Sequence, residues 1–169
     1  FQFKNLNVKV KVFLFMFVNN IIDIMAKTID KYIANMQLVL RNLPNQVESI
    51  VKSNSERILD LNRETQLFER GVDSKGQKLQ EYAYFTIQIK QLLKQPYDRT
   101  TLFYSGQFYD GFTYKFDANT YTLEIFSVDR KTPQLIAKYG GDIFGLDEQN
   151  KLYLNQSIIK PQLDQWLLK

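Results

Sequence analysis

The sequence predicts an α+β fold, with N-terminal amphipathic helices, a small antiparallel sheet and C-terminal helices. Apolar residues first recur at helical spacing, from Ile29 to Leu61. The period then changes to two between about residues 102 and 128, where aromatic residues are frequent. Helical spacing returns near the C-terminus, after Gly140 and Gly141. This order of elements is typical of the α+β class.

Two long amphipathic helices are expected before Gly71. One face of the first consists of apolar residues at spacings of four and three, namely Ile29, Ile33, Met36, Leu40 and Leu43. We expect Pro44 to stop this helix or to kink the chain into the second one. The second helix is expected to end near Arg70. Its apolar stripe is interrupted at Asn54 and consists of Val47, Ile50, Val51, Ile58 and Leu61. Such heptad-like spacing usually marks core packing, and only sometimes a surface for a partner helix.

The middle and the end of the chain alternate turn signals with short elements. Residues 71–78 are polar, with two glycines and an Asp, which predicts an ordered loop or tight turn. A helix is expected over 81–94, then strand-like runs at 102–104, 108–116 and 121–128. The last two runs form an antiparallel hairpin at about 108–128. A short helix over 133–139 follows, and Pro161 either kinks the C-terminal helix or opens a new one.

Residues 1–24 form a leader of doubtful status. Three lysines precede the apolar run Val12–Val18, as in a signal peptide, but no small-x-small cleavage site follows. The longest uncharged stretch, Val12–Ile22, is shorter than the about 20 residues of a membrane-spanning helix. The alternating valines at 8, 10 and 12 also fit an edge strand. Because Met25 resembles a natural start, we favour upstream translation or weak order for 1–24, and a single α+β domain for 25–169.

Composition favours a binding or structural role over catalysis. The chain has no Cys and no His, which excludes disulfides, thiolate metal sites and Cys nucleophiles, and removes the commonest acid–base side chain and metal ligand. We therefore expect no enzyme, no metal and no cofactor. The formal net charge is +4, and the basic residues are scattered rather than gathered into the stripe of a nucleic-acid binder.

Several partial motifs fail on inspection. Residues 71–78 have the glycine spacing of a P-loop, but place Gln77 at the phosphate-binding Lys and Lys78 at the magnesium-binding hydroxyl. Ser105 lacks the upstream Gly of a nucleophile elbow. The spacing of Asp110, Asp117 and Asp129 is not that of a calcium-binding loop. We therefore expect turn or strand-end roles for these residues rather than a metal site.

An aromatic run gives the alternative function, a small nucleic-acid-binding protein that stacks bases on an aromatic sheet face. The run consists of Phe103, Tyr104, Phe108, Tyr109, Phe112, Tyr114 and Phe116. It contains one Lys and one acid, Asp110, and a second acid, Asp117, follows it directly, whereas stacking platforms usually line a positive groove. Core and sheet packing explains these aromatics more simply, and the tyrosines also suit a protein–protein surface.

Three segments in a fixed order carry a resemblance to a known family. Residues 62–76 read NRETQLFERGVDSKG and precede Tyr82 or Tyr84, Thr86 and Lys90. Residues 102–108 read LFYSGQF, and residues 143–148 read IFGLDE. Over about residues 56–168 this order resembles the tail-completion or neck proteins of tailed bacteriophages, the virion-morphogenesis group.

The resemblance implies assembly rather than catalysis. Such proteins form a ring at the head–tail junction, as neck, tail-completion or tail-terminator proteins. The implied partners are other copies and other phage structural proteins, namely the connector or adaptor and the tail tube or terminator. No small-molecule substrate, specific nucleic acid or membrane is implied. The implied location is the virion, and the host cytoplasm during assembly.

The resemblance also implies structural roles for eight residues. Gly71, Asp73 and Gly76 would shape an exposed loop that meets a partner ring. Ser105 and Gly106 would set the turn that starts the sheet. The residues that would dock the C-terminal helix are Phe144, Gly145 and Leu146.

Overall fold

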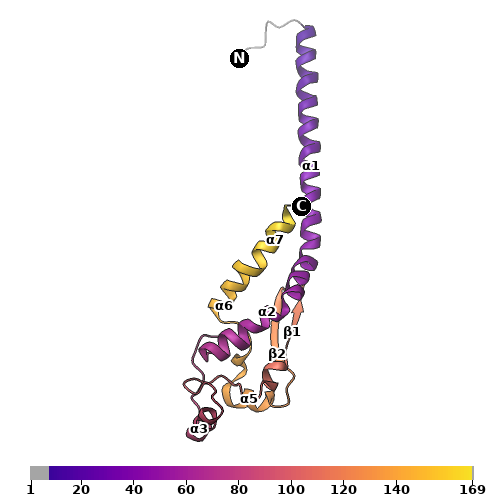
Figure 1. Ribbon diagram of the computed structural model, residues 1–169. Helices are drawn as coiled ribbons and strands as arrows, with labels where there is room; N and C mark the ends of the chain where they lie inside the picture. Colours follow the sequence, from indigo (N-terminus) through magenta and orange to yellow (C-terminus); the bar gives the residue numbers. More distant parts are fainter. Residues whose placement is uncertain (1–7, 169) are drawn as a thin grey trace. The chain divides into compact units, whose positions relative to one another are not determined.

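The computed structural model describes residues 8–168, with side chains from residue 15 onward. The chain divides into two compact units, one ending at Leu43 and one beginning at Pro44. The elements are a long N-terminal helix, a two-stranded antiparallel hairpin and C-terminal helices (Figure 1). The predicted α+β class is therefore confirmed.

The first helix, α1, runs from Val8 to Ser53 and continues through Pro44, so the expected stop does not occur there. An interior proline removes one helical hydrogen bond, but the residues on both sides of Pro44 remain helical. The valine alternation at positions 8–12, which also fits an edge strand, is helical. The break comes instead at Asn54, whose side-chain Nδ2 donates to the carbonyl of Ile50 at 2.8 Å.

The second predicted helix consists of two parts. Helix α2 spans Ser55–Asp60, and the π-helix η2 spans Leu61–Arg70. Gly71 ends η2 in the left-handed conformation (φ 63°), at the predicted position. Two members of the predicted stripe in this run, Ile58 and Leu61, are buried, so this part of the stripe does pack in the core.

The hairpin consists of β1, Phe112–Asp117, and β2, Thr122–Ser127, paired from Phe112↔Ser127 to Asp117↔Thr122. The predicted hairpin is confirmed, but its first strand begins at Phe112 rather than at residue 108. Residues Gln107–Asp110 form the short helix α4 instead, and 102–104 have no regular structure. The reason is that Phe108 and Tyr109 are adjacent and both buried, whereas successive strand residues point to opposite faces.

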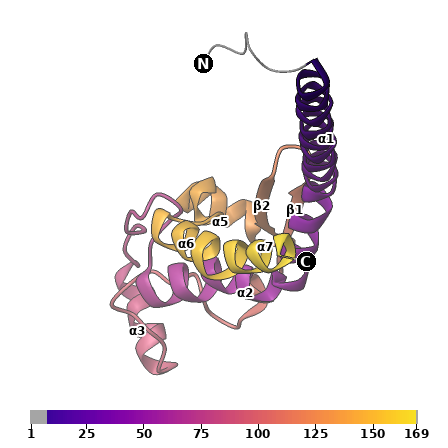
Figure 2. The same ribbon diagram turned by 90° about the horizontal axis from the view of Figure 1, so that it is seen from above.

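The other helices lie close to their predicted positions. Helix α3 spans Tyr84–Leu92, somewhat shorter than expected, and α5 spans Thr132–Tyr139 and ends at Gly140. The 3-10 turn η3, Gly141–Ile143, leads toward α6, Glu148–Tyr153. The C-terminal arm continues through the π-helix η4, Leu154–Ile159, into α7, Lys160–Leu167 (Figure 2). Pro161 lies in the first turn of α7 and so opens a helix, one of the two predicted alternatives.

The core combines aliphatic residues with a cluster of aromatic rings, and its described members lie between Val47 and Leu163. Neighbouring ring centroids are 5.2–6.5 Å apart, and half of the pairs are edge to face, a favoured geometry of aromatic pairs. The cluster consists of Phe68, Phe103, Phe108, Tyr109, Phe112 and Phe144. The cluster joins η2, α4 and β1 to the irregular segments that contain Phe103 and Phe144.

Candidate functional site

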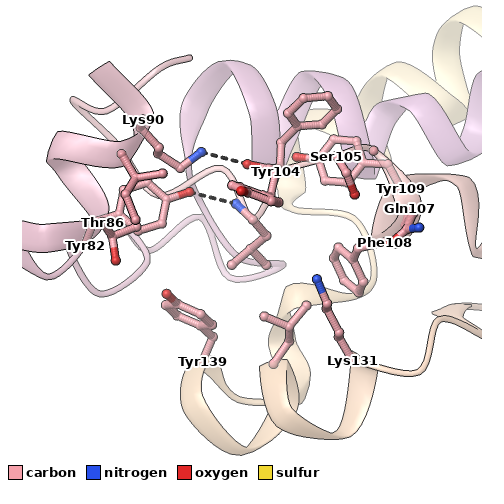
Figure 3. Close-up of a pocket in the computed structure, with 15 residues that line it drawn as sticks. Tyr82, Thr86, Lys90, Tyr104, Ser105, Gln107, Phe108, Tyr109, Lys131 and Tyr139 are labelled. Atoms are coloured by element: carbon pink, nitrogen blue, oxygen red, sulfur yellow. Dashed lines mark hydrogen bonds between the residues drawn. The ribbon is translucent and has the colours of Figure 1, made fainter. Parts of the chain in front are cut away.

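A pocket of about 250 Å³ lies between α3, the segment 101–106, α4 and α5 (Figure 3). Most of its lining is aromatic and aliphatic. The amines of Lys90 and Lys131 and the hydroxyls of Tyr104 and Tyr139 add polar groups. Its volume suits one side chain or a small organic group, since pockets for drug-sized ligands begin at about 300 Å³.

Lys90 is buried beside this pocket, with 3% of its surface exposed. Its Nζ donates to the carbonyl of Phe103 at 2.7 Å and to Gln95 Oε1 at 3.2 Å. The same amine lies 4.9 Å from the centroid of the Tyr82 ring. Lysine is almost never buried without a partner, and here a carbonyl, an amide oxygen and a ring face replace a carboxylate. The amine is therefore engaged in holding the backbone at Phe103.

The hydroxyl of Tyr82 fixes the backbone just before Phe103, at Thr101 and Leu102. It accepts from the N–H groups of Thr101 at 2.9 Å and Leu102 at 3.2 Å. Leu102 has φ 58°, the left-handed region that branched side chains rarely adopt. Gln95 Nε2 donates to the carbonyl of Tyr104 at 2.7 Å. Side chains of other segments, rather than a strand partner, thus satisfy the polar groups of this segment.

Tyr109 completes this arrangement from α4. Its hydroxyl donates to the carbonyl of Thr101. Burial, with smaller effects from Glu64 and Tyr82, raises the pKa of Tyr109 far above its ordinary value. The hydroxyl therefore stays protonated and remains a donor at physiological pH.

The polar groups of the lining are mainly amines and hydroxyls. The described lining includes two amines and several hydroxyls but no carboxylate. Of the two amines, Lys131 is exposed and its Nζ lies 6.0 Å from the centroid of the Tyr104 ring. Such a lining suits an apolar group that carries a carbonyl or carboxylate oxygen.

Ser105 and Gly106 lie at the rim of this pocket, and their predicted role needs correction. Gly106 has φ 89° and its carbonyl accepts from the N–H of Asp110 at 2.9 Å. The two residues therefore start the helical turn α4, and the sheet begins only afterwards, at Phe112. Ser105 is exposed.

The loop 71–78 is an ordered tight turn, as predicted. Asp73 Oδ1 accepts from the N–H groups of Lys75 at 2.9 Å and Gln77 at 2.8 Å. Gly76 is exposed with φ 73°, a conformation that favours glycine. At Gly71, a Cβ would lie 3.0 Å from the Cβ of Arg99, so close approach as well as positive φ requires glycine there.

The segment 142–146 packs directly against this loop. The N–H of Ser74 donates to the carbonyl of Asp142 at 2.7 Å, and Lys75 Nζ pairs with the Asp142 carboxylate at 2.6 Å. Gly145 has φ 94°, and a Cβ on it would lie 3.5 Å from Ser74 Cβ. The structure therefore brings together residues 71–76 and 142–146, which overlap two of the segments that carry the resemblance, 62–76 and 143–148.

Phe144 and Leu146 face inward from this segment. The ring of Phe144 lies 6.0 Å from that of Phe108 and 5.5 Å from that of Phe112, and Leu146 is buried. The segment leads directly into α6, whose N-cap is Asp147. Its observed contacts are thus with the aromatic cluster and the start of α6.

A buried polar network fixes the same segment to η2, and sequence reasoning missed it. Gln66 Nε2 donates to the carbonyl of Gly145 at 3.0 Å, and Gln66 Oε1 accepts from the N–H of Asp147 at 2.8 Å. Asp147 caps α6 through the N–H of Asn150 at 3.0 Å and pairs with Arg70 at 2.6 Å. Asp is a favoured N-cap residue, and Asp147 followed by Glu148 in the first turn is a signal that would have located this helix start.

The aromatic run of the nucleic-acid hypothesis lies largely in the core. Phe108, Tyr109 and Phe112 are 6%, 3% and 5% exposed, so these three rings are not available to stack on bases. The packing interpretation is confirmed for them. Asp117 Oδ1 and Asp129 Oδ1 accept from backbone N–H groups two residues later, at 2.9 and 2.8 Å, as the predicted turn roles require.

Comparison with known proteins adds no assignment. No family model, no curated protein and no solved structure matches the chain. Over the described residues 8–168, no helix has both the length and the apolar character needed to cross a bilayer. In the same part of the chain, no three carboxylates gather in a way that could hold a metal ion.

Proposed function

We propose that the protein is a structural protein of a tailed bacteriophage, located at the head–tail junction as a neck, tail-completion or tail-terminator protein. It acts by assembling with copies of itself and with neighbouring rings, and no step of its action is catalytic. The proposal combines the sequence resemblance over residues 56–168 with one structural observation.

That observation is the junction of residues 71–76 with residues 142–146. These segments are distant in the sequence, yet they are joined by the Ser74–Asp142 hydrogen bond and the Lys75–Asp142 ion pair. The junction makes the two segments one continuous feature of this chain, which is what a shared docking element needs. The tip of the loop, residues 75–78, is exposed, as a surface that meets a partner ring requires.

The local geometry suits a rigid docking element. The Asp73 carboxylate fixes the backbone of the loop, and Gly71 anchors its base against Arg99. A preorganised loop loses little conformational entropy when a partner binds. The side chains of Lys75 and Gln77 are exposed at its tip, and the Lys75 amine is also paired with Asp142.

The first test is the sequence of the DNA on both sides of the gene. Neighbouring genes for a portal, a large terminase, a capsid protein or a tail tube, read in the same direction, would support the proposal. A gene surrounded by host metabolic genes would overturn it.

The second test uses phage that lack this gene, complemented with variants. We expect Lys75→Ala with Gln77→Ala to lower the yield of infectious particles by at least tenfold, with separate heads and tails in electron micrographs. The matched control, Lys151→Ala with Gln156→Ala, changes two exposed residues of α6 and η4 and should restore full yield. Equal yields from both variants would exclude the loop as the docking element.

A further inference from the structure

Residues 15–43 of α1 expose large apolar side chains along the helix. They include Phe15 at 68%, Ile29 at 55% and Leu40 at 61% exposed. Apolar residues exposed singly are normal, but a continuous stripe marks an interaction surface. Isolated helices gain little stability from propensity alone and depend on the packing of an apolar face. This face therefore requires a partner.

The stripe follows a strict heptad repeat. When Phe15 is taken as position a, every a and d position up to residue 43 is apolar, with Phe15, Val18, Ile22, Met25, Ile29, Tyr32, Met36, Val39 and Leu43. Position e adds Ala26, Ile33 and Leu40, which widens the face. A period of 3.5 residues is what keeps one face of a helix in contact with another helix around a supercoil.

The charged residues avoid this face. In the same register all five charges of residues 15–43 fall at the outer positions b, c and f, namely Asp23, Lys27, Asp30, Lys31 and Arg41. The flanking positions e and g, whose charges usually select a different partner or orientation, carry none. Identical helices can therefore meet without like charges facing each other.

We propose that residues 15–43 of α1 associate with the same residues of other copies of this chain, as a helical bundle. The half-exposed apolar side chains of the stripe present on the order of 1,000 Å² per chain, against about 800 Å² per partner in a standard stable interface. The proposal rests on α1 alone and does not depend on the proposed function.

A membrane surface is the competing occupant, and the charges disfavour it. Helices that lie on membranes are typically rich in Lys and Arg on their polar face. Over residues 15–43, Asp23 and Asp30 nearly balance three basic residues, and Lys9 and Lys11 precede them near the start of α1. A second copy needs no such basic face.

The test measures the mass of the full chain by size exclusion with light scattering, at increasing concentration. We expect wild type to reach a multiple of the 20.0 kDa chain mass. Ile29→Lys with Met36→Lys places two charges at position a, and should raise the concentration needed for association by at least tenfold. The matched control, Asn20→Lys with Ala34→Lys, adds the same charge at position f and should associate like wild type.

Circular dichroism and thermal unfolding show whether each variant is folded. The changes lie outside the core, whose described members begin at Val47, so each variant should keep a cooperative unfolding transition, and any fall of its midpoint caused by lost association should depend on protein concentration. If the Lys variant aggregates, Ile29→Asn with Met36→Asn provides a milder change with the same expectation.

Three results would overturn the proposal. Wild type could remain monomeric at every concentration. The position-a and position-f variants could have the same mass as each other. A monomeric wild type could sediment with vesicles of phosphatidylcholine and phosphatidylglycerol while the position-a variant does not, which would assign the face to a membrane.

Discussion

The loop 71–78 and the segment 101–106 are both irregular, but different interactions hold them. The loop is fixed mainly from within, since the Asp73 carboxylate binds the N–H groups of Lys75 and Gln77. The segment is fixed from outside, by the side chains of Tyr82, Lys90, Gln95 and Tyr109.

This difference separates two ways of ordering a backbone without a helix or a sheet. A self-contained turn needs only a few neighbouring residues, so losing one interaction affects mainly the turn. A segment held by remote side chains depends on α3 and α4 being in place. Substitutions in its holders should therefore reduce global stability, while substitutions in the loop should act locally.

The largest effect is expected for Lys90→Met. Methionine fills a similar volume but leaves the carbonyl of Phe103 without its donor, which should cost about 2–3 kcal/mol of the free energy of unfolding. Urea denaturation measures this cost. Lys131→Met, at the exposed amine of the same pocket, should change stability by less than about 0.5 kcal/mol. Equal costs at both lysines would show that the hydrogen bond from Lys90 to the Phe103 carbonyl contributes no particular stability.

Tyr82→Phe should cost about 2 kcal/mol, because two backbone N–H groups lose their acceptor while the ring stays. Tyr84→Phe is the matched control, since Tyr84 is 76% exposed and loses no hydroxyl contact of this kind. Denaturation midpoints of the two variants give the comparison. A Tyr82 variant as stable as the control would show that Thr101 and Leu102 find other acceptors.

Tyr109 should make stability fall at high pH. Its pKa is raised in the folded protein, so its contribution is fully present below the unfolded pKa of about 10 and is lost as pH rises above it. The expected slope is up to about 1.4 kcal/mol per pH unit. Tyr109→Phe should be less stable near neutral pH but have a shallower slope above pH 10. Parallel slopes for wild type and variant, measured by urea unfolding, would contradict the assignment.

The smallest effect is expected for Asp73→Ala, at about 1 kcal/mol, since two exposed backbone N–H groups lose a carboxylate and return to water. Hydrogen exchange should accelerate at the amides of Lys75 and Gln77 and remain unchanged in segment 101–106. Lys78→Ala, at an exposed residue of the same loop, provides the reference. Faster exchange in both regions would mean that the two are coupled.

The same contrast explains how much the sequence could predict. The loop 71–78, the hairpin and the helix stops at Gly71 and Gly140 were predictable, because each depends on residues adjacent in the sequence. The strand expected at 102–104 was wrong because its conformation depends on the Tyr82 hydroxyl and on Lys90, whose hydrogen-bond partners in this segment are 13 to 20 positions away.

The candidate site was predictable only in part. Tyr82 and Lys90 entered through the resemblance, but nothing local shows that a lysine will be buried against a carbonyl. The network of Gln66 and Asp147 was missed because polar residues in an amphipathic helix are normally assigned to the solvent face. The helix stop expected at Pro44 was also wrong, since α1 continues through Pro44 and ends just before Asn54.

The link between Gln66 and the start of α6 has a consequence for synthesis. The bonding partners of Gln66 lie 79 and 81 residues later in the chain. At about 5–20 residues per second, a ribosome needs roughly 4–16 s to add them. During this interval η2 cannot complete its buried hydrogen bonds. The core around η2 can therefore close only after residue 147 has been synthesised.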